Sequence, residues 1–338
     1  MNIRENLFEL SETAGASGNE QNVSEKALEI LRKYCPDAEI VNGNVTGRFG
    51  IRNENLPELV LDAHIDQIGF IVSYITEDGF IKTGNLGGID RRLLPAQPVV
   101  IHGKSDVKGV ICSIPPHLSD SNSVPSINDV AIDTGLTKSE LEEIISLGDT
   151  ITFDVKCRQL LNNRVTGGAF DDRSGITAVL YALDLLRQSD KPLKYNVTVI
   201  FSVQEELGER GAKIGAFAIN PDVALAVDVS FAHATGENEM KCGKLGKGAM
   251  IGISPSLSRR ISDELIDTAK KNNIPYQIEV MNGLTSTNAD QYSVSRDGAE
   301  TCTISIPLRN MHTPVEVIDL DDIRYTGELI YQFIINNS

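Results

Sequence analysis

The segments VTVIFSV at residues 197–203 and VALAVDV at residues 223–229 are two nearly continuous apolar runs that decide the fold class. A strand that is apolar along its whole length is covered on both faces, as in a sheet packed between layers of helices. Outside these runs, apolar residues recur at helical spacing at 176–186, and a further helix is expected near 259–271. The sequence therefore predicts an α/β fold.

The same alternation of strand and helix extends to both ends of the chain. Its further elements are expected to be helices at 3–10 and 23–34, strands at 57–62, 277–281 and 301–306, and a helix from about 321. We therefore assign residues 1–66 and 165–338 to one α/β domain.

Residues 67–164 differ in character and are predicted to form an inserted β domain. Short β-like segments separated by Gly and Pro fill the stretch from about 68 to 115, and a polar stretch at 115–135 is expected to be a long loop. Thr137 and Glu140 have the spacing of a capping box before a short helix. An insertion with its own apolar strands is too large for a surface loop, so we expect it to mediate dimerisation.

The composition excludes several classes of protein. The 338 residues carry a formal net charge of −16, which argues against nucleic-acid binding because phosphate contacts need clustered Lys and Arg. The sequence contains no stretch of about 20 apolar residues that could span a membrane. The first dozen residues are acidic without an apolar core, and the five cysteines are too far apart for a zinc or disulfide framework. We therefore expect a cytoplasmic location.

Short segments rich in possible metal ligands follow the predicted strands. His64 and Asp66 are two residues apart, so on a strand they point to the same side, and Asp66 could orient the imidazole of a metal-binding His64. Asp171 and Asp172 enter the buried helix at 176–186. They could simply cap that helix, or one carboxylate could bridge two cations while the other supports it.

Glu205 and Glu206 directly follow the strand at 197–203, so one could ligate a metal while the other acts as a general base. Asp228 lies within an apolar run, where a carboxylate is costly to bury without a cation or hydrogen bonds. His312 is the last candidate. No comparable acidic setting surrounds the other histidines, which are His102, His117 and His233.

Taken together, these segments offer two histidines and three carboxylates as ligands and leave further carboxylates to spare. That number matches two divalent cations that share one carboxylate and keep an open position for water. Such a pair can activate water and polarise a carbonyl group.

Five segments in this order resemble the M42 metallopeptidases, a family of glutamyl and deblocking aminopeptidases. They are AHIDQIG at 63–69, GGAFDDRSG at 167–175, QEELGERGA at 204–212, AVDVS at 226–230 and IPLRNMHTPVEV at 306–317. The resemblance covers essentially the whole chain. It implies a phosphorylase/hydrolase-like catalytic domain with a mixed sheet, an inserted β-barrel-like dimerisation domain, and dimers that assemble into a tetrahedral dodecamer.

By the same resemblance, two metal ions, zinc or cobalt, bind to each chain. His64 and Asp228 would hold one ion and Glu206 with His312 the other, while Asp171 would bridge them. The peptide bond that follows Asp171 would be cis.

The resemblance also assigns roles to two further carboxylates. Glu205 would be the general base, and Asp66 would steady His64. The implied reaction removes N-terminal residues from short peptides. Glu205 would take a proton from the attacking water and pass it to the leaving amine.

The chain departs from the family pattern at two places. Gln67 stands where many members have an acidic residue, and Ser286-Thr287-Asn288-Ala289 replaces GTDA. Neither is a ligand position, but the second lies in a segment associated with the substrate pocket, so substrate preference is open.

Two other classes of function are weighed against the peptidase. An endoglucanase-type glycosidase would also use paired carboxylates, but it would leave the five ligand-type residues unexplained, and the sequence is only 5% aromatic. A catalytically silent assembly protein would not need the intact set of ligands and base.

Overall fold

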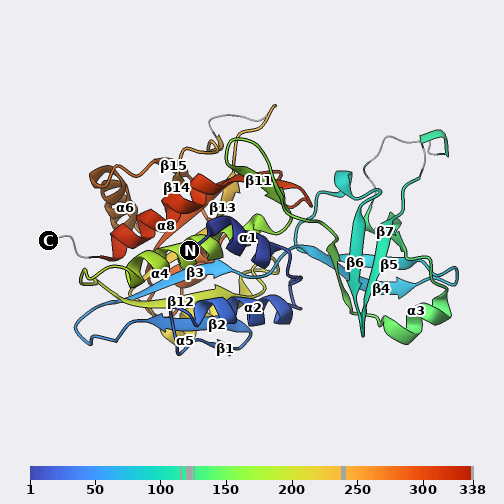
Figure 1. The fold of residues 1–338 in the computed structure, drawn as a ribbon, viewed down its shortest axis with the longest axis horizontal. Coiled ribbons are helices and arrows are strands. Elements are labelled where there is room, and N and C mark those ends of the chain that lie inside the picture. Colours follow the sequence, from blue (N-terminus) through green and yellow to red (C-terminus); the bar gives the residue numbers. More distant parts are fainter. Residues whose placement is uncertain (115, 119–123, 125, 237–240, 336–338) are drawn as a thin grey trace.

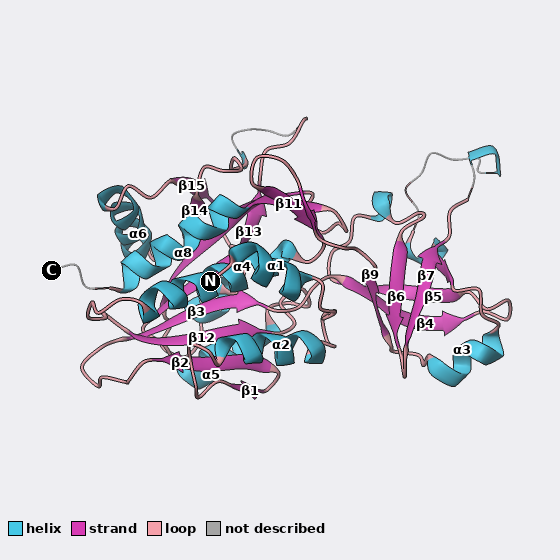
Figure 2. Cartoon of the chain, viewed as in Figure 1, coloured by secondary structure: helices cyan, strands magenta, loops and turns pink. Residues whose placement is uncertain are grey.

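The computed structural model describes residues 1–114, 116–118, 124, 126–236 and 241–335. A large sheet flanked by helices and a smaller barrel lie next to each other along the long axis of the molecule (Figures 1 and 2). The mixed sheet and the barrel confirm the predicted fold class. Among the described residues, no helix has the length and apolar character needed to cross a membrane.

The large sheet is mixed, and eleven strands of the described chain form it. They are β1 (Glu39–Val41), β2 (Asn44–Phe49), β3 (Glu58–His64), β10 (Arg158–Gln159), β11 (Arg164–Gly167), β12 (Asn196–Ser202), β13 (Val223–Phe231), β14 (Ala249–Ile253), β15 (Tyr276–Val280), β16 (Glu300–Arg309) and β17 (Glu316–Asp319). The spatial order is β1-β2-β12-β3-β13-β16-β17-β11-β10, with β14 beside β16 and β15 beside β14.

Four central strands, β12, β3, β13 and β16, run parallel to one another. The two apolar runs found in the sequence form β12 and β13, and nearly all of their residues are buried. Because the strands are parallel, their carboxyl ends lie at one edge of the sheet, which is where ligands bind in open α/β sheets.

Helices cover both faces of the large sheet. The main apolar core joins one face to α1 (Ile3–Ser11), α2 (Gln21–Leu31), α4 (Phe170–Arg187), α6 (Arg259–Lys271) and α8 (Leu320–Ile334). A smaller cluster joins the other face to α5 (Arg210–Ile219) and α7 (Ala289–Ser293). Every central strand is therefore buried on both sides, which explains why its sequence is apolar without alternation.

The barrel is closed and antiparallel, with strand order β4-β5-β8-β7-β6-β9. Its strands are β4 (Gly69–Ile75), β5 (Ile81–Leu86), β6 (Pro98–His102), β7 (Asp106–Ile111), β8 (Ala131–Asp133) and β9 (Thr150–Phe153). It has its own apolar core, which includes Phe70, Ile101 and Ile132. The expected capping box is present at α3 (Lys138–Ile144), where Thr137 and Glu140 bond reciprocally.

The stretch 115–135 is not a loop throughout. Short 3₁₀ helices occupy Pro116–Leu118 and Ile127–Asp129, and a third lies earlier at Arg91–Leu93. Strand β8 closes the barrel because its backbone pairs with β5 and β7, contacts that the polar local sequence does not reveal. Residues 115, 119–123 and 125 of the expected loop lie outside the described residues.

Candidate active site

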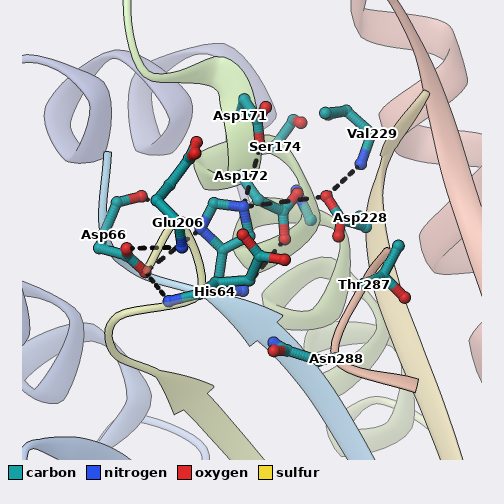
Figure 3. Close-up of polar contacts among 12 residues, drawn as sticks. His64, Asp66, Asp171, Asp172, Ser174, Glu206, Asp228, Val229, Thr287 and Asn288 are labelled. Carbon is teal, nitrogen blue, oxygen red and sulfur yellow. Dashed lines mark hydrogen bonds and ion pairs between the residues drawn. The ribbon is translucent and has the colours of Figure 1, made fainter. Parts of the chain in front are cut away.

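The structure brings the predicted site residues together at the carboxyl edge of the sheet. Each comes from the end of a strand or the start of a helix, and they are His64 on β3, Asp66 after it, Asp171 in α4, Glu205 and Glu206 after β12, Asp228 on β13 and His312 after β16. All of them except Asp66 line one cleft of about 550 Å³. Figure 3 shows the His64 imidazole lying between Asp66 and Asp228.

Asp171 contacts both predicted histidine ligands. One carboxylate oxygen, Oδ1, lies 2.9 Å from Nε2 of His64, and the other, Oδ2, lies 3.3 Å from Nε2 of His312. The same nitrogen of His312 is 3.3 Å from Oε1 of Glu206. Nε2 of His64 is also 3.9 Å from Oδ1 of Asp228. One carboxylate therefore lies between two separate sets of possible ligands.

Asp66 lies behind His64, away from the cleft, and is fully buried. Its Oδ1 lies 3.5 Å from Nδ1 of His64, and its main-chain oxygen lies 3.1 Å from the same nitrogen. The backbone N–H groups of Glu205 and Glu206 donate to its two carboxylate oxygens at 2.9 and 3.1 Å. Asp66 thus connects the end of β3 to the loop that follows β12.

Asp172 has a different surrounding from Asp171, and the peptide bond between them is cis, as the resemblance implied. Its carboxylate accepts hydrogen bonds from the backbone N–H groups of His64, at 3.2 Å, and Gly175, at 2.9 Å. Two sets of residues could each hold a metal ion, because the ligand atoms within each set lie within 4.8 Å of one another. One set is His64, Asp172 and Asp228, and the other is Asp171, Glu206 and His312. Because both oxygens of Asp172 already accept backbone hydrogen bonds, we regard it as a support for the site.

The backbone beside the site is held in a conformation that side chains disfavour. Ala169, Gln204 and His312 have φ values of 58°, 56° and 59°, in the left-handed region. Such conformations cost free energy and are found where the surrounding structure holds a functional side chain in place. Each of these three positions is at, or within two residues of, Asp171, Glu205 or His312.

Glu316 was missed by the sequence analysis although it holds two of these segments. It is buried at the start of β17, where Oε2 accepts from the N–H groups of Phe170, at 2.7 Å, and Asp171, at 3.3 Å. Its Oε1 accepts from the N–H of His312 at 3.2 Å. An acidic residue in the short segment PVEV carries no distinctive pattern, because its partners lie in other parts of the chain.

Asp62 is a second buried carboxylate that the sequence analysis missed. It lies two residues before His64 and accepts hydrogen bonds from Ser202 Oγ at 2.7 Å, Asn288 Nδ2 at 3.2 Å and Tyr292 Oη at 2.8 Å. The departure at Asn288 thus places an amide against this carboxylate. Its neighbours Thr285, Ser286 and Thr287 line the cleft. In Figure 3, Thr287 lies below Asp228, and Asn288 lies lower and nearer to His64.

Burial and crowding raise the pKa values of most carboxylates in the cleft. Burial, with a further rise from nearby Asp171, brings the pKa of Glu205 to about 9 and the pKa values of Glu206 and Asp228 to about 7. Burial also acts on Asp171, but hydrogen bonds with His312 and His64 bring its pKa below the usual range. A bound cation stabilises such crowded carboxylates because it supplies the positive charge that nearby side chains do not provide.

This chain is similar to known aminopeptidases in sequence and in fold. The profile of the family described as M42 glutamyl aminopeptidase matches residues 43–329. The lysyl aminopeptidase of Pyrococcus furiosus is 30% identical to this chain over 332 residues, which cover 96% of this chain and 94% of the relative.

Two solved structures share the fold. Aminopeptidase APDkam598 from the archaeon Desulfurococcus kamchatkensis superposes with a TM-score of 0.92 at 34% identity and covers 98% of this chain and 94% of its own. The TET1 peptidase of Pyrococcus horikoshii superposes with a TM-score of 0.85 at 31% identity and covers 99% of this chain and 100% of its own. The chain belongs to the M42 family of aminopeptidases, which are peptide-bond hydrolases.

Proposed function

We propose that this aminopeptidase removes N-terminal residues from short peptides and depends on two divalent cations per chain. In this proposal His64 and Asp228 hold one cation, Glu206 and His312 hold the other, and Asp171 is shared. The observation that carries it is the position of Asp171, whose two oxygens contact the two histidines at 2.9 and 3.3 Å. A carboxylate in this position can bind two cations at once.

The donor set fits zinc or cobalt. Imidazole nitrogens and carboxylate oxygens are common ligands of both metals, and no thiolate lies among the lining residues of the cleft. When bound, such cations polarise the scissile carbonyl group and lower the pKa of a coordinated water. The three proposed carboxylate ligands are buried or nearly so, and cations would provide the counter-charge that they need.

Glu205 is proposed as the general base. Its carboxylate lines the cleft, and among the described residues it accepts no hydrogen bond. It is therefore free to take a proton from the attacking water and to deliver it to the leaving amine. Asp66 holds the backbone N–H of Glu205 and lies against His64, so it would position both the base and a ligand.

Two isosteric substitutions test these roles. Glu205→Gln should lower kcat by about 10²–10⁴-fold, the usual contribution of general base catalysis, with metal content and thermal stability unchanged. Glu206→Gln should weaken metal binding, because an amide is a poorer ligand than a carboxylate, and its activity should recover partly at high zinc or cobalt. Loss of metal from the Glu205 variant with full occupancy in the Glu206 variant would reverse the assignment.

The barrel is proposed to be the dimerisation domain, with the inserted domain at residues 67–164 and the catalytic domain at 1–66 and 165–338. Support comes from the exposed apolar side chains Tyr74 and Val110 on two barrel strands. The structure of the Pyrococcus horikoshii TET1 peptidase is described as assembling into a tetrahedron or a large octahedral shell. We infer that dimers of this chain assemble into a tetrahedral dodecamer, and sedimentation at the single-chain mass would contradict it.

The other classes of function are not favoured. A glycosidase would leave the two histidines and the shared carboxylate without a role, and a silent assembly protein would not need Glu205 in the cleft. A cytoplasmic location and the absence of nucleic-acid and membrane partners remain proposals that rest on composition. Chelator-sensitive release of an amino acid from a short peptide separates the peptidase from both alternatives.

A further inference from the structure

The cleft contains more carboxylates than the proposed reaction uses. Three of them are proposed metal ligands and Glu205 is the proposed base, which leaves Glu209 and Glu279 among the lining residues. Within the described part of the chain, no Lys or Arg lines this cleft. Two bound cations would neutralise the ligands and the base, because four positive charges would meet four carboxylates, and the remaining pair would keep the cleft acidic.

Glu279 is placed close to the proposed metal ligand Asp228. Its Oε2 accepts a hydrogen bond from Ser305 Oγ at 2.8 Å, and its Oε1 accepts one from Ser230 Oγ. Ser305 is the register partner of Asp228 on the neighbouring parallel strand, and Ser230 lies two residues after Asp228. The side chains of Ser305 and Ser230 therefore project from the same face of the sheet as Asp228, and Glu279 is bonded to both of them.

The hydrogen bonds of Glu279 fix its carboxylate without neutralising it. Both partners are hydroxyl groups, which carry no charge. Glu209, by contrast, accepts a hydrogen bond from the side-chain amide of Gln291 at 2.9 Å. Glu279 is thus an oriented carboxylate in the wall of the cleft.

The wall near Glu279 also offers apolar surface. Met281 follows it by two residues, and Met311 and Phe231 line the same cleft. A lysine side chain has a flexible four-carbon stem that packs on apolar surface while its ammonium group reaches a polar partner. A cleft with apolar walls and one fixed carboxylate has the chemistry needed to receive such a side chain.

We propose that Glu279 selects peptides whose N-terminal residue is lysine or arginine. The inference rests on the proposed function, since it concerns the first side chain of a peptide bound at the same site. An acidic N-terminal residue would bring a further carboxylate into a cleft that already contains Glu209 and Glu279 and that no described Lys or Arg lines. The relatives differ in the N-terminal residue that their names give. The family is described as M42 glutamyl aminopeptidase, whereas the relative from Pyrococcus furiosus is a lysyl aminopeptidase.

The test compares a lysyl substrate with a norleucyl substrate, which lacks only the side-chain amine, and with a glutamyl substrate, which carries the opposite charge. Lysyl-, norleucyl- and glutamyl-p-nitroanilide are assayed with the metal-loaded enzyme and with Glu279→Gln, which keeps the shape of the side chain. We expect kcat/KM to fall in the order lysyl, norleucyl, glutamyl. The substitution should lower the ratio of lysyl to norleucyl kcat/KM by about 10- to 100-fold, the usual effect of losing a charged hydrogen bond.

Two controls keep the result specific. Glu54→Gln makes the same chemical change on an exposed residue of the loop between β2 and β3 and should leave both substrates unaffected. Competitive inhibition by free lysine, compared with free norleucine, measures recognition without turnover, and Glu279→Gln should abolish the difference.

The outcomes separate the two proposals. Hydrolysis with an unchanged ratio of lysyl to norleucyl activity in Glu279→Gln, or a preference of the unaltered enzyme for glutamyl substrate, would overturn the assignment of Glu279 alone. Failure to hydrolyse any substrate in the presence of zinc or cobalt would overturn the proposed function and this inference with it.

Discussion

Replacing Asn288 with Asp tests whether the departure from GTDA is explained by Asp62. The Asn288 side chain is buried, with 2% exposure, and its amide donates to Asp62 Oδ1 at 3.2 Å and to Ser202 Oγ at 2.8 Å. Asp62 has no exposure at all. Asn288→Asp would remove the donor and place a second carboxylate against the first, although the two side chains have nearly the same shape.

The magnitude follows from these contacts. A hydrogen bond to a charged group contributes about 1.5–3 kcal/mol to the free energy of unfolding. Two like charges about 4 Å apart repel by about 4 kcal/mol at an effective dielectric constant of 20, and part of this is relieved when one carboxyl group takes up a proton. We therefore expect Asn288→Asp to destabilise the protein by about 3–5 kcal/mol, similar to breaking a buried ion pair.

A double-mutant cycle measures the interaction directly. Asp62→Asn should restore most of the stability in the Asn288→Asp background, because an amide again faces a carboxylate with the two positions exchanged. The assay is thermal and urea unfolding at matched metal content, with Asn55→Asp as a control for the same change on an exposed loop. Additive effects of the two substitutions, or an Asn288→Asp variant as stable as the unaltered protein, would refute the pairing.

Three further outcomes are expected. Asp171→Ala should reduce occupancy of both metal sites, and loss of a single ion by elemental analysis would show that Asp171 is not shared. Glu316→Gln should lower metal affinity about 10- to 100-fold, the usual effect of changing a residue that orients ligands, as measured by competition with a chelator. Ser286→Gly should stabilise the protein by roughly 0.5–1 kcal/mol in unfolding experiments, because Ser286 has a φ of 56° and glycine tolerates this conformation; a lower unfolding temperature would contradict this.

Much of the fold follows from local sequence patterns. The runs at 197–203 and 223–229 form β12 and β13 because strands covered by helices on both faces must be apolar throughout. The capping box at Thr137 is likewise local, since both partners lie within four residues. Strand β8 was not predicted, because three residues in a polar stretch become a strand only when β5 and β7 supply the pairing partners.

The candidate site could be predicted in part for a similar reason. Ligand-type residues placed directly after buried strands are expected to meet, because the carboxyl ends of parallel strands share one edge. The contacts of Glu316 could not be foreseen, since they join β17 to the start of α4 and to the loop that carries His312. Those contacts depend on strand order in space, which one sequence does not specify.

Asp62 and Asp228 are both buried carboxylates in apolar strands, but they have different partners. Each is a carboxylate within an apolar strand, so the cost of burying a charge applies equally to both. Asp62 meets this cost with three side-chain donors. Among the described residues, only the N–H of Val229 donates to Asp228, at Oδ1, which leaves its second oxygen for the cleft. The difference lies in α7 and in the loop before it, which supply Asn288 and Tyr292 to one carboxylate and not to the other. A buried carboxylate in a strand therefore predicts a partner, and only the fold decides whether that partner is a protein donor or a metal.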